Sequence, residues 1–384
     1  MVSQFLKKSS SRNTGLEQKP LILMTGVDLR YKGGTAYFAK ELLNSYLIEK
    51  YHVVYIGTTS NGNVIKKLFK WLIGLIRFSY WIAVHKPQLI HLHTSSGTSF
   101  YRKLILLKLA KMRKLPVLVH IHGGGFFDFY KEGGVLLKML VKTFLQSVNG
   151  IIVVANIWAK SIAGITEKVE KIYVVHNFIN VDKFQKPRKD HDTRDCFTIL
   201  YLGAFLREKG ILDVIATART IITYEKNLKF MLCGYDQRSV DLSNLNKDKE
   251  LQRVIKIIPW LNDEEKIKAY HTADVFFSPS YYEAFGLTNV EAMASGLPIV
   301  TTNAGGIPEV VEDQVNGFLF NPGNIEGFTR ILLKLMANKE LRHKMSKINM
   351  EKAKSLFSKP VGIEKMDQIY NELIYQAMRS SHRK

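Results

Sequence analysis

The sequence predicts an α/β protein made of two Rossmann-like, parallel-sheet domains that face each other across a cleft. The chain has 384 residues, and at about 150 residues per domain this length favours two domains. Short apolar runs bounded by turn residues alternate with longer segments of helical pattern, which is typical of a parallel sheet covered by helices. The alternation stops in a polar stretch at residues 185–195 and then restarts.

Ten apolar runs predict the strands of the two sheets. The first sheet takes the runs 21–27, 52–57, 89–93, 116–122 and 150–155, and the second takes 197–203, 228–234, 254–259, 273–279 and 298–302. We therefore expect the following segments: a flexible leader at 1–20, an N-terminal domain at 21–188, a C-terminal domain at 189–360, and a final helix at 361–384 that crosses back to the first domain. Ligands of such sheets bind beyond the carboxyl ends of the strands, so the informative motifs should follow strands.

The charge of the chain is unevenly distributed. Lys and Arg number 55 against 34 Asp and Glu, for a net charge of +21, while 46% of the residues are hydrophobic, which excludes a disordered chain. Residues 1–190 hold 29 basic and 10 acidic residues, and the interval between Glu49 and Asp128 holds twelve basic residues and no acidic one. The first domain is therefore expected to meet an anionic partner.

No export signal or membrane span is predicted. Residues 1–20 lack the apolar core of a signal peptide, and the most apolar stretch, 68–84, is interrupted by two cations. The two cysteines, Cys196 and Cys233, each adjoin a predicted strand, which favours buried free thiols over a disulfide or a metal cluster. We expect a cytoplasmic protein.

Two carboxylates flank a predicted helix start in the second domain. Gly286 and Leu287 would open the helix, with Glu283 in the preceding loop and Glu291 in the second turn. Eight helical residues span about 12 Å, so the carboxylates suit two ends of an elongated ligand better than an acid/base pair. The free N–H groups of Phe285, Gly286 and Leu287 would hold a phosphate, and Glu291 could accept hydrogen bonds from a ribose diol. Alternatively, both glutamates are ordinary surface residues.

A basic loop follows the first strand of the second domain. It supplies Arg207 and Lys209 after Gly203, and cations at a strand-to-helix turn match a diphosphate clamp. A loop of this kind can equally be solvated and without a ligand.

Glycine-rich turns follow two strands of the first domain. Gly33 and Gly34 would allow a phosphate to approach the backbone closely. The segment matches neither a G-x-G-x-x-G fingerprint nor a P-loop, which disfavours a dehydrogenase or an NTPase. The other turn places His122 at a strand end, before three glycines, from where its side chain would reach the cleft.

Four histidines alternate on two predicted strands. His91 and His93 share one face of their strand, as do His120 and His122 on the next. Metal ligation is one interpretation, but no carboxylate or cysteine accompanies them. We predict groups of the core that support the site, and no metal.

These motifs together resemble a known enzyme family. They are EAFGLTNVE followed by AMASGLPIV, GAFLREKG, KGGT, HIHGGG and VVHNFINVDKF. Over about residues 21–355 the chain resembles the retaining nucleotide-sugar glycosyltransferases of family four, which have the two-domain GT-B fold. The resemblance implies a C-terminal domain that binds a nucleotide diphosphate sugar, an N-terminal domain that binds the acceptor, and no metal or other cofactor.

The resemblance also implies roles for single residues in donor binding. Glu291 would bind the ribose, Lys209 with Arg207 the diphosphate, and Glu283 with the amides of residues 285–287 the sugar and its phosphate. Many relatives carry an arginine where this chain has Ala204, so the clamp depends on whether Arg207 replaces it.

On the acceptor side, the resemblance places Gly33 and Gly34 near the diphosphate. His122 would contact the transferred sugar at the reaction centre. Retention without a protein nucleophile is implied, with front-face attack by the acceptor and transfer of its proton to the leaving diphosphate.

Residues 61–87 predict an amphipathic helix suited to a membrane interface. A helix would align Lys66, Lys70, Gly74 and Arg77 along one stripe, with aromatic residues elsewhere. The candidate interface residues are Lys66, Lys67, Lys70, Trp71, Arg77 and Trp81. The alternative is a helix packed on the first sheet with a solvated basic edge.

We therefore expect a retaining glycosyltransferase that acts on a lipid-linked or saccharide acceptor in bacterial surface polysaccharide or glycolipid synthesis, peripheral on the inner face of the membrane. The alternatives are a nucleotide-sugar epimerase or hydrolase of the same fold, or a non-enzymatic basic binder of an anionic membrane or polymer. Nucleic acid is not an expected partner, because the cations lie among long aliphatic residues and not among stacking aromatics. An esterase is disfavoured because the chain has no G-x-S-x-G elbow.

Overall fold

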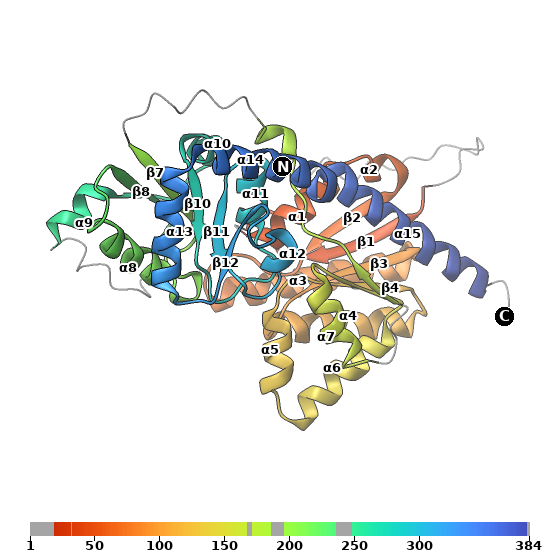
Figure 1. The fold of residues 1–384 in the computed structure, drawn as a ribbon. Coiled ribbons are helices and arrows are strands. Elements are labelled where there is room, and N and C mark those ends of the chain that lie inside the picture. The colour runs from red at the N-terminus through yellow and green to blue at the C-terminus, as the bar shows by residue number, and fades with distance from the viewer. Residues whose placement is uncertain (1–18, 32, 167–170, 186–195, 236–247, 382–384) are drawn as a thin grey trace.

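The computed structural model describes residues 19–31, 33–166, 171–185, 196–235 and 248–381, which form two α/β halves lying side by side (Figure 1). Nearly all of the expected leader, 1–20, and most of the polar stretch, 185–195, lie outside these residues. The prediction of two parallel sheets is confirmed.

The first sheet has six strands in the order β2-β1-β3-β4-β5-β6, all parallel. Their bounds are β1 Leu21–Gly26, β2 His52–Gly57, β3 Leu89–Thr94, β4 Val117–Ile121, β5 Gly150–Val153 and β6 Ile172–Val174. The sequence predicted five of these strands. It missed β6, which is an edge strand of three half-buried residues.

The second sheet also has six parallel strands among the described residues, in the order β12-β11-β10-β7-β8-β9. Their bounds are β7 Phe197–Leu202, β8 Leu228–Cys233, β9 Ile255–Ile258, β10 Val275–Ser278, β11 Ile299–Thr302 and β12 Gly317–Phe320. The edge strand β12 was missed: only two of its four residues are buried, so it lacks the continuous buried run of a central strand.

Helices cover both faces of the first sheet. The helices of this half are α1 Gly34–Leu43, α2 Leu47–Lys50, α3 Val64–Val84, α4 Thr98–Met112, α5 Gly125–Glu132, α6 Val135–Ser147 and α7 Asn156–Ala163, with a 3-10 turn η2 at Val181–Lys183. Residues of α3 to α7 share one core with Ile90 and Leu92 of β3. Because side chains alternate along a strand, His91 and His93 face the opposite side, toward α1 and the C-terminal helix.

The second half is covered in the same way. Its elements are the 3-10 turn η4 Arg207–Lys209 and the helices α8 Ile211–Ile221, α9 Lys249–Val254, α10 Asp263–Thr272, α11 Leu287–Ala294, α12 Ile307–Val310, α13 Ile325–Ala337 and α14 Lys339–Phe357. Helix α10 begins at a capping box in which Asn262 and Glu265 satisfy each other's backbone N–H groups. Helix α11 begins after Gly286, the start that the sequence predicted.

The last helix, α15 Lys359–Ser381, runs from the second half back across the first sheet (Figure 1). Asp367 accepts hydrogen bonds from Lys50 Nζ at 2.7 Å and Tyr51 Oη at 2.6 Å. Farther along, the hydroxyl of Tyr370 lies 2.8 Å from His91 Nδ1. One helix thus ties the two halves together.

The crossing point has no room for a side chain at Gly362, which gives a stability prediction. A Cβ atom there would lie 1.9 Å from Cδ1 of the buried Phe178. We expect Gly362→Ala to lower the free energy of unfolding by about 1–3 kcal/mol through overpacking. Urea unfolding checks this, with Gly164→Ala as the control, because a Cβ there meets only ordinary contacts. Equal stability of both variants would show that α15 adjusts freely.

Candidate active site

A cleft of about 800 Å³ is lined by both halves of the molecule. The first half contributes Gly33 and Gly34 after β1 and His122 after β4, and the second contributes Glu283 and Glu291. The cleft is also lined by the helix-start residues Phe285, Gly286 and Leu287. The structure therefore brings together predicted residues that are up to 258 positions apart, counted from Gly33 to Glu291. They meet because both sheets present their carboxyl edges here.

Lys209 and Arg207 are not placed alike. Lys209 lines a small cavity of about 110 Å³ that shares Glu283 and Leu287 with the cleft, and its Nζ forms an ion pair with Glu283. Arg207 is exposed and lines neither cavity. The two residues lie on the single 3-10 turn η4, where each residue advances a third of a turn, so side chains two apart point in different directions. Of the two cations, Lys209 is the one that lines a cavity beside Glu283.

Both carboxylate oxygens of Glu291 are hydrogen-bonded by side chains of α10. Glu291 is buried, with only 3% of the residue exposed. Lys266 Nζ lies 2.5 Å from one carboxylate oxygen, and the hydroxyl of Tyr270 donates to the other at 2.9 Å. Lys266 and Tyr270 are four residues apart and so share a face of α10. Each carboxylate oxygen keeps a further lone pair, so Glu291 can still accept hydrogen bonds from a ligand.

Burial and the charge of Glu291 raise the pKa of Tyr270 well above its ordinary value, so this hydroxyl stays protonated and remains a donor. Neither partner of Glu291 was predicted from the sequence. Their four-residue spacing was the available signal, but nothing in the sequence said that this face of α10 would meet α11.

The start of α11 is open toward the cleft. Gly286 has φ +89°, and a Cβ there would lie 2.8 Å from Asn289 Nδ2. This conformation turns the chain from the loop into the helix, whose first N–H groups have no partner within the helix. Across the cleft, nothing lies within 4 Å of the Cβ position of Gly34. An anion can approach the backbone on both sides.

Helix α7 of the first half is bound directly by the second half. Glu309 of α12 accepts hydrogen bonds from the N–H groups of Asn156 at 2.8 Å and Ile157 at 2.9 Å, so it caps α7 from across the interface. Trp158 Nε1 donates to the carbonyl oxygen of Ala284 at 2.7 Å, within the loop that carries Glu283. Burial raises the pKa of Glu309, but the hydrogen bonds that it accepts from these N–H groups outweigh burial and hold the pKa below its ordinary value.

Trp158 and Glu309 were not predicted from the sequence. Each stands alone in its segment, and its partner lies more than a hundred residues away.

His122 belongs to a layer of four stacked or hydrogen-bonded histidines. Its Nε2 lies 2.6 Å from His93 Nδ1, and its ring stacks on that of His120 with centroids 3.9 Å apart. Burial lowers the pKa of His91 and of His122 to about 3, and lowers the pKa of His93 and of His120 well below the ordinary value. All four rings are therefore neutral at physiological pH.

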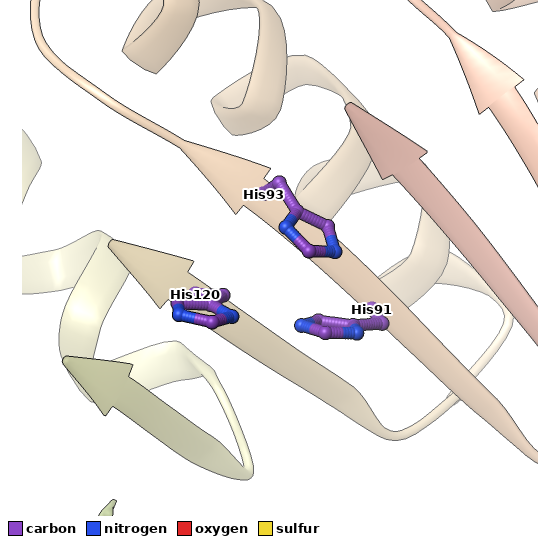
Figure 2. A group of neighbouring side chains, drawn as sticks. All are labelled: His91, His93 and His120. Carbon is purple, nitrogen blue, oxygen red and sulfur yellow. The ribbon is translucent and has the colours of Figure 1, made fainter. Parts of the chain in front are cut away.

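Figure 2 shows the three innermost rings, His91, His93 and His120, on two neighbouring strands. Each offers one ring nitrogen, and these nitrogens lie within 4.8 Å of one another. Imidazoles are ligands of Zn²⁺, Cu²⁺ and Ni²⁺. The group contains no carboxylate or thiolate, and a divalent ion would keep its full charge in buried surroundings. The donor set fits a neutral buried layer better than a metal site.

Part of the predicted membrane-interface set faces the protein, which corrects the predicted stripe on α3. Lys70 Nζ lies 2.9 Å from Asp28 Oδ2. Trp71 and Trp81 pack against the core that α3 to α7 share with β3. The reason is the four-residue spacing of Gly74, Phe78 and Ile82, which are the buried residues of α3. The stripe that begins at Lys66 runs into this buried face. Lys66, Lys67 and Arg77 themselves are exposed.

The outer face of α3 is apolar. Ile65, Phe69 and Ile76 are 76%, 65% and 69% exposed and are spaced so that they lie on one side of the helix. Further exposed apolar residues of the same helix are Val64, Leu68, Leu72, Ile73, Tyr80 and Val84. We call Ile65, Phe69 and Ile76 the α3 apolar stripe. No helix among the described residues is long and apolar enough to cross a membrane.

The neutral histidine layer predicts a pH dependence of stability. As pH falls below 6.5, the ordinary value, histidines of the unfolded chain take up protons, but His91 and His122 in the folded chain do so only near pH 3. Each such histidine should therefore lower the free energy of unfolding by about 1.4 kcal/mol per pH unit over this window. Urea unfolding at pH 7, 6 and 5 measures the slope.

His120 allows a matched test, because neither of its ring nitrogens has a hydrogen-bond partner among the described residues. His120→Leu should make the slope shallower by about one proton. The control His343→Leu removes an exposed histidine and should leave the slope unchanged. Identical slopes in all three proteins would contradict a buried neutral layer.

Two family models match the chain in succession. The model described as Glycosyltransferase Family 4 matches residues 34–183, and the model described as Glycosyl transferases group 1 matches residues 182–352. The chain is 25% identical over 348 residues to UDP-Gal:alpha-D-GlcNAc-diphosphoundecaprenol alpha-1,3-galactosyltransferase of Escherichia coli, which covers 86% of this chain and 87% of that protein. It is 26% identical over 313 residues to alpha-monoglucosyldiacylglycerol synthase of Streptococcus pneumoniae, covering 72% and 70%.

Solved structures share the fold at low sequence identity. Sucrose-phosphate synthase from Thermosynechococcus elongatus superposes with a TM-score of 0.76 at 19% identity, over 93% of this chain and all of that chain. Anabaena HepE in complex with UDP superposes with a TM-score of 0.71 at 15% identity, over 92% and 100%. The two family models match consecutive segments over most of the sequence, and the two sheets meet at a cleft along their carboxyl edges. The chain therefore belongs to the family-four glycosyltransferases of the GT-B fold.

Proposed function

We propose that the protein is a retaining, metal-independent glycosyltransferase that moves a sugar from a nucleoside diphosphate sugar to a lipid-linked acceptor at the cytoplasmic face of the membrane. The observation that carries this proposal is the shared cleft, in which Glu291, Glu283, the start of α11 and His122 meet. By their names, one of the two relatives above acts on a diphosphoundecaprenol-linked sugar, and the other makes an alpha-monoglucosyldiacylglycerol. Synthesis of a bacterial surface polysaccharide or glycolipid is the corresponding setting.

The donor would lie along the second half of the cleft. Glu291 accepts hydrogen bonds from the ribose diol, as a buried carboxylate with spare lone pairs can. The N–H groups at the start of α11 and the ammonium of Lys209 bind the diphosphate. Glu283 and His122 contact the sugar from opposite halves. The uridine nucleotides named for several relatives favour a uridine diphosphate sugar.

The reaction breaks the bond between the anomeric carbon and the diphosphate oxygen and forms a bond from the same carbon to an acceptor hydroxyl oxygen. Negative charge grows on the leaving diphosphate, where Lys209 and the α11 amides stabilise it. The acceptor's proton passes to an oxygen of that diphosphate on the same face of the sugar. The configuration is then retained without a protein nucleophile.

The acceptor half would bind the membrane through the α3 apolar stripe. Exposed aliphatic and aromatic side chains beside cations suit a helix that lies in the headgroup region. Lys66, Lys67 and Arg77 are exposed on the same helix, and each cation near an anionic leaflet contributes about 1 kcal/mol. The segment between Glu49 and Asp128 contains no acidic residue, so no side-chain carboxylate within it repels anionic lipid.

The proposed activity can be tested directly. Incubation with labelled uridine, guanosine and adenosine diphosphate sugars and a membrane lipid extract should transfer sugar to lipid from one donor class. Glu291→Gln should weaken donor binding at least tenfold, because the diol loses a charged acceptor, while His122→Asn should mainly lower kcat. Glu264→Gln, an exposed glutamate of α10, is the control. Hydrolysis or epimerisation that proceeds equally without acceptor would identify the alternative enzymes instead.

Membrane contact is tested with vesicles of phosphatidylglycerol and phosphatidylcholine. Replacing the α3 apolar stripe by serine should weaken vesicle binding more than tenfold, because each fully buried apolar side chain contributes about 1.5–3 kcal/mol. Donor affinity should not change. The control replaces three exposed apolar residues of the second half, Tyr224, Val315 and Leu356, by serine. Equal loss of binding in both triple variants, or none in either, would rule out α3 as the membrane surface.

A further inference from the structure

His93 is buried beside the proposed reaction centre but does not line the cleft. It lies on β3, opposite His120 in the parallel ladder, and its residue is 2% exposed. His122, two residues beyond His120, does line the cleft. The two rings are only 9° from parallel, and His93 Nδ1 is 2.6 Å from His122 Nε2. The two nitrogens are therefore within hydrogen-bonding distance of each other.

A neutral imidazole has one N–H and one lone pair, so this hydrogen bond has two possible directions. The other nitrogen of His93, Nε2, is buried and has no hydrogen-bond partner among the described residues. If His93 carried its proton on Nε2, that N–H would be orphaned inside the protein. A buried unpaired N–H is rarer and more costly than an unused lone pair. The proton of His93 therefore belongs on Nδ1, where it has an acceptor.

We infer that His93 donates its Nδ1–H to His122 Nε2 and thereby holds the proton of His122 on Nδ1. His122 then meets the ligand as a hydrogen-bond donor and not as a base. His93 is a positioning residue, since it acts only through His122. The importance of this role for catalysis rests on the proposed function, but the tautomer of His122 does not.

The surroundings oppose any charged alternative. Protonation of His93 is opposed electrostatically by His91, His120, His122 and Lys103. Lys103 is itself buried and donates to Thr58 Oγ1 at 2.6 Å. Phe38 of α1 covers the layer, with its ring edge-on to His122 at 5.5 Å between centroids. The pair therefore stays neutral, and the direction of its hydrogen bond is the remaining variable.

A donor at this position agrees with the proposed chemistry. A sugar offers hydroxyl and ring oxygens, which accept a hydrogen bond from Nδ1–H. A basic His122 could compete with the leaving diphosphate for the acceptor's proton. Fixing the tautomer removes that competition and leaves the diphosphate as the proton's destination.

Nitrogen-15 NMR of the full-length protein with labelled histidine tests the inference without an activity assay. The resonances of His122, assigned with His122→Asn, should show a protonated Nδ1 and an unprotonated Nε2. His93→Leu should remove this preference. His93→Asn, whose amide nitrogen lies near the position of Nδ1, should restore it in part. A His122 protonated on Nε2 in the wild-type protein would overturn the inference.

Kinetics separate positioning from a merely structural role. His93→Leu should lower kcat at least tenfold while the KM for the donor stays within threefold, and His93→Asn should recover most of kcat. The control is His91→Leu, because His91 Nδ1 is paired with Tyr370 and not with His122. This variant should lose stability but keep both the tautomer and kcat.

The failures are distinguishable. Wild-type kcat in His93→Leu would overturn the positioning role. Full activity in His122→Asn would instead remove His122 from the proposed site, and the NMR result would still decide the tautomer.

Discussion

The candidate active site depends on the contact that joins the carboxyl edges of two parallel sheets, because residues from both edges line its cleft. Glu309 caps α7 from the other half, and Trp158 binds the loop of Glu283 through the carbonyl of Ala284. On the opposite side of the first sheet, α15 returns from the second half and pairs with Tyr51 and His91. Through these contacts, the start of α11 lines the same cleft as His122 and Gly34.

Burial acts on two kinds of ionisable group in the site, a carboxylate and a layer of histidines. Glu291 keeps its carboxylate in a buried position because Lys266 and Tyr270 each supply a donor. The histidine layer is arranged in the opposite way, since no acid stabilises protonated rings and burial keeps all four neutral. The cleft thus combines charged residues of the second half with an uncharged histidine layer of the first half.

Much of the fold could be predicted from sequence, because central parallel strands are continuous apolar runs and α11 starts at a glycine. The edge strands β6 and β12 could not, since each is partly exposed and lacks the continuous buried run of a central strand. Local sequence patterns predicted Glu283, Glu291 and His122 as site residues. They did not predict Lys266, Trp158 or Glu309, because tertiary packing alone determines the partners of these residues. The prediction of an exposed stripe through Lys70 was wrong because α3 is apolar on both faces, and residue spacing alone does not show which face packs on the sheet.

The most direct measurement of the central claim compares uridine diphosphate with its 2′,3′-dideoxy analogue by calorimetry, in the wild-type protein and in Glu291→Gln. If the cleft holds a nucleoside diphosphate with its ribose on Glu291, the wild-type protein should bind the natural diol at least tenfold more tightly than the analogue, and the difference should vanish in the variant. Equal affinity of the wild-type protein for both nucleotides would contradict the placement of the donor.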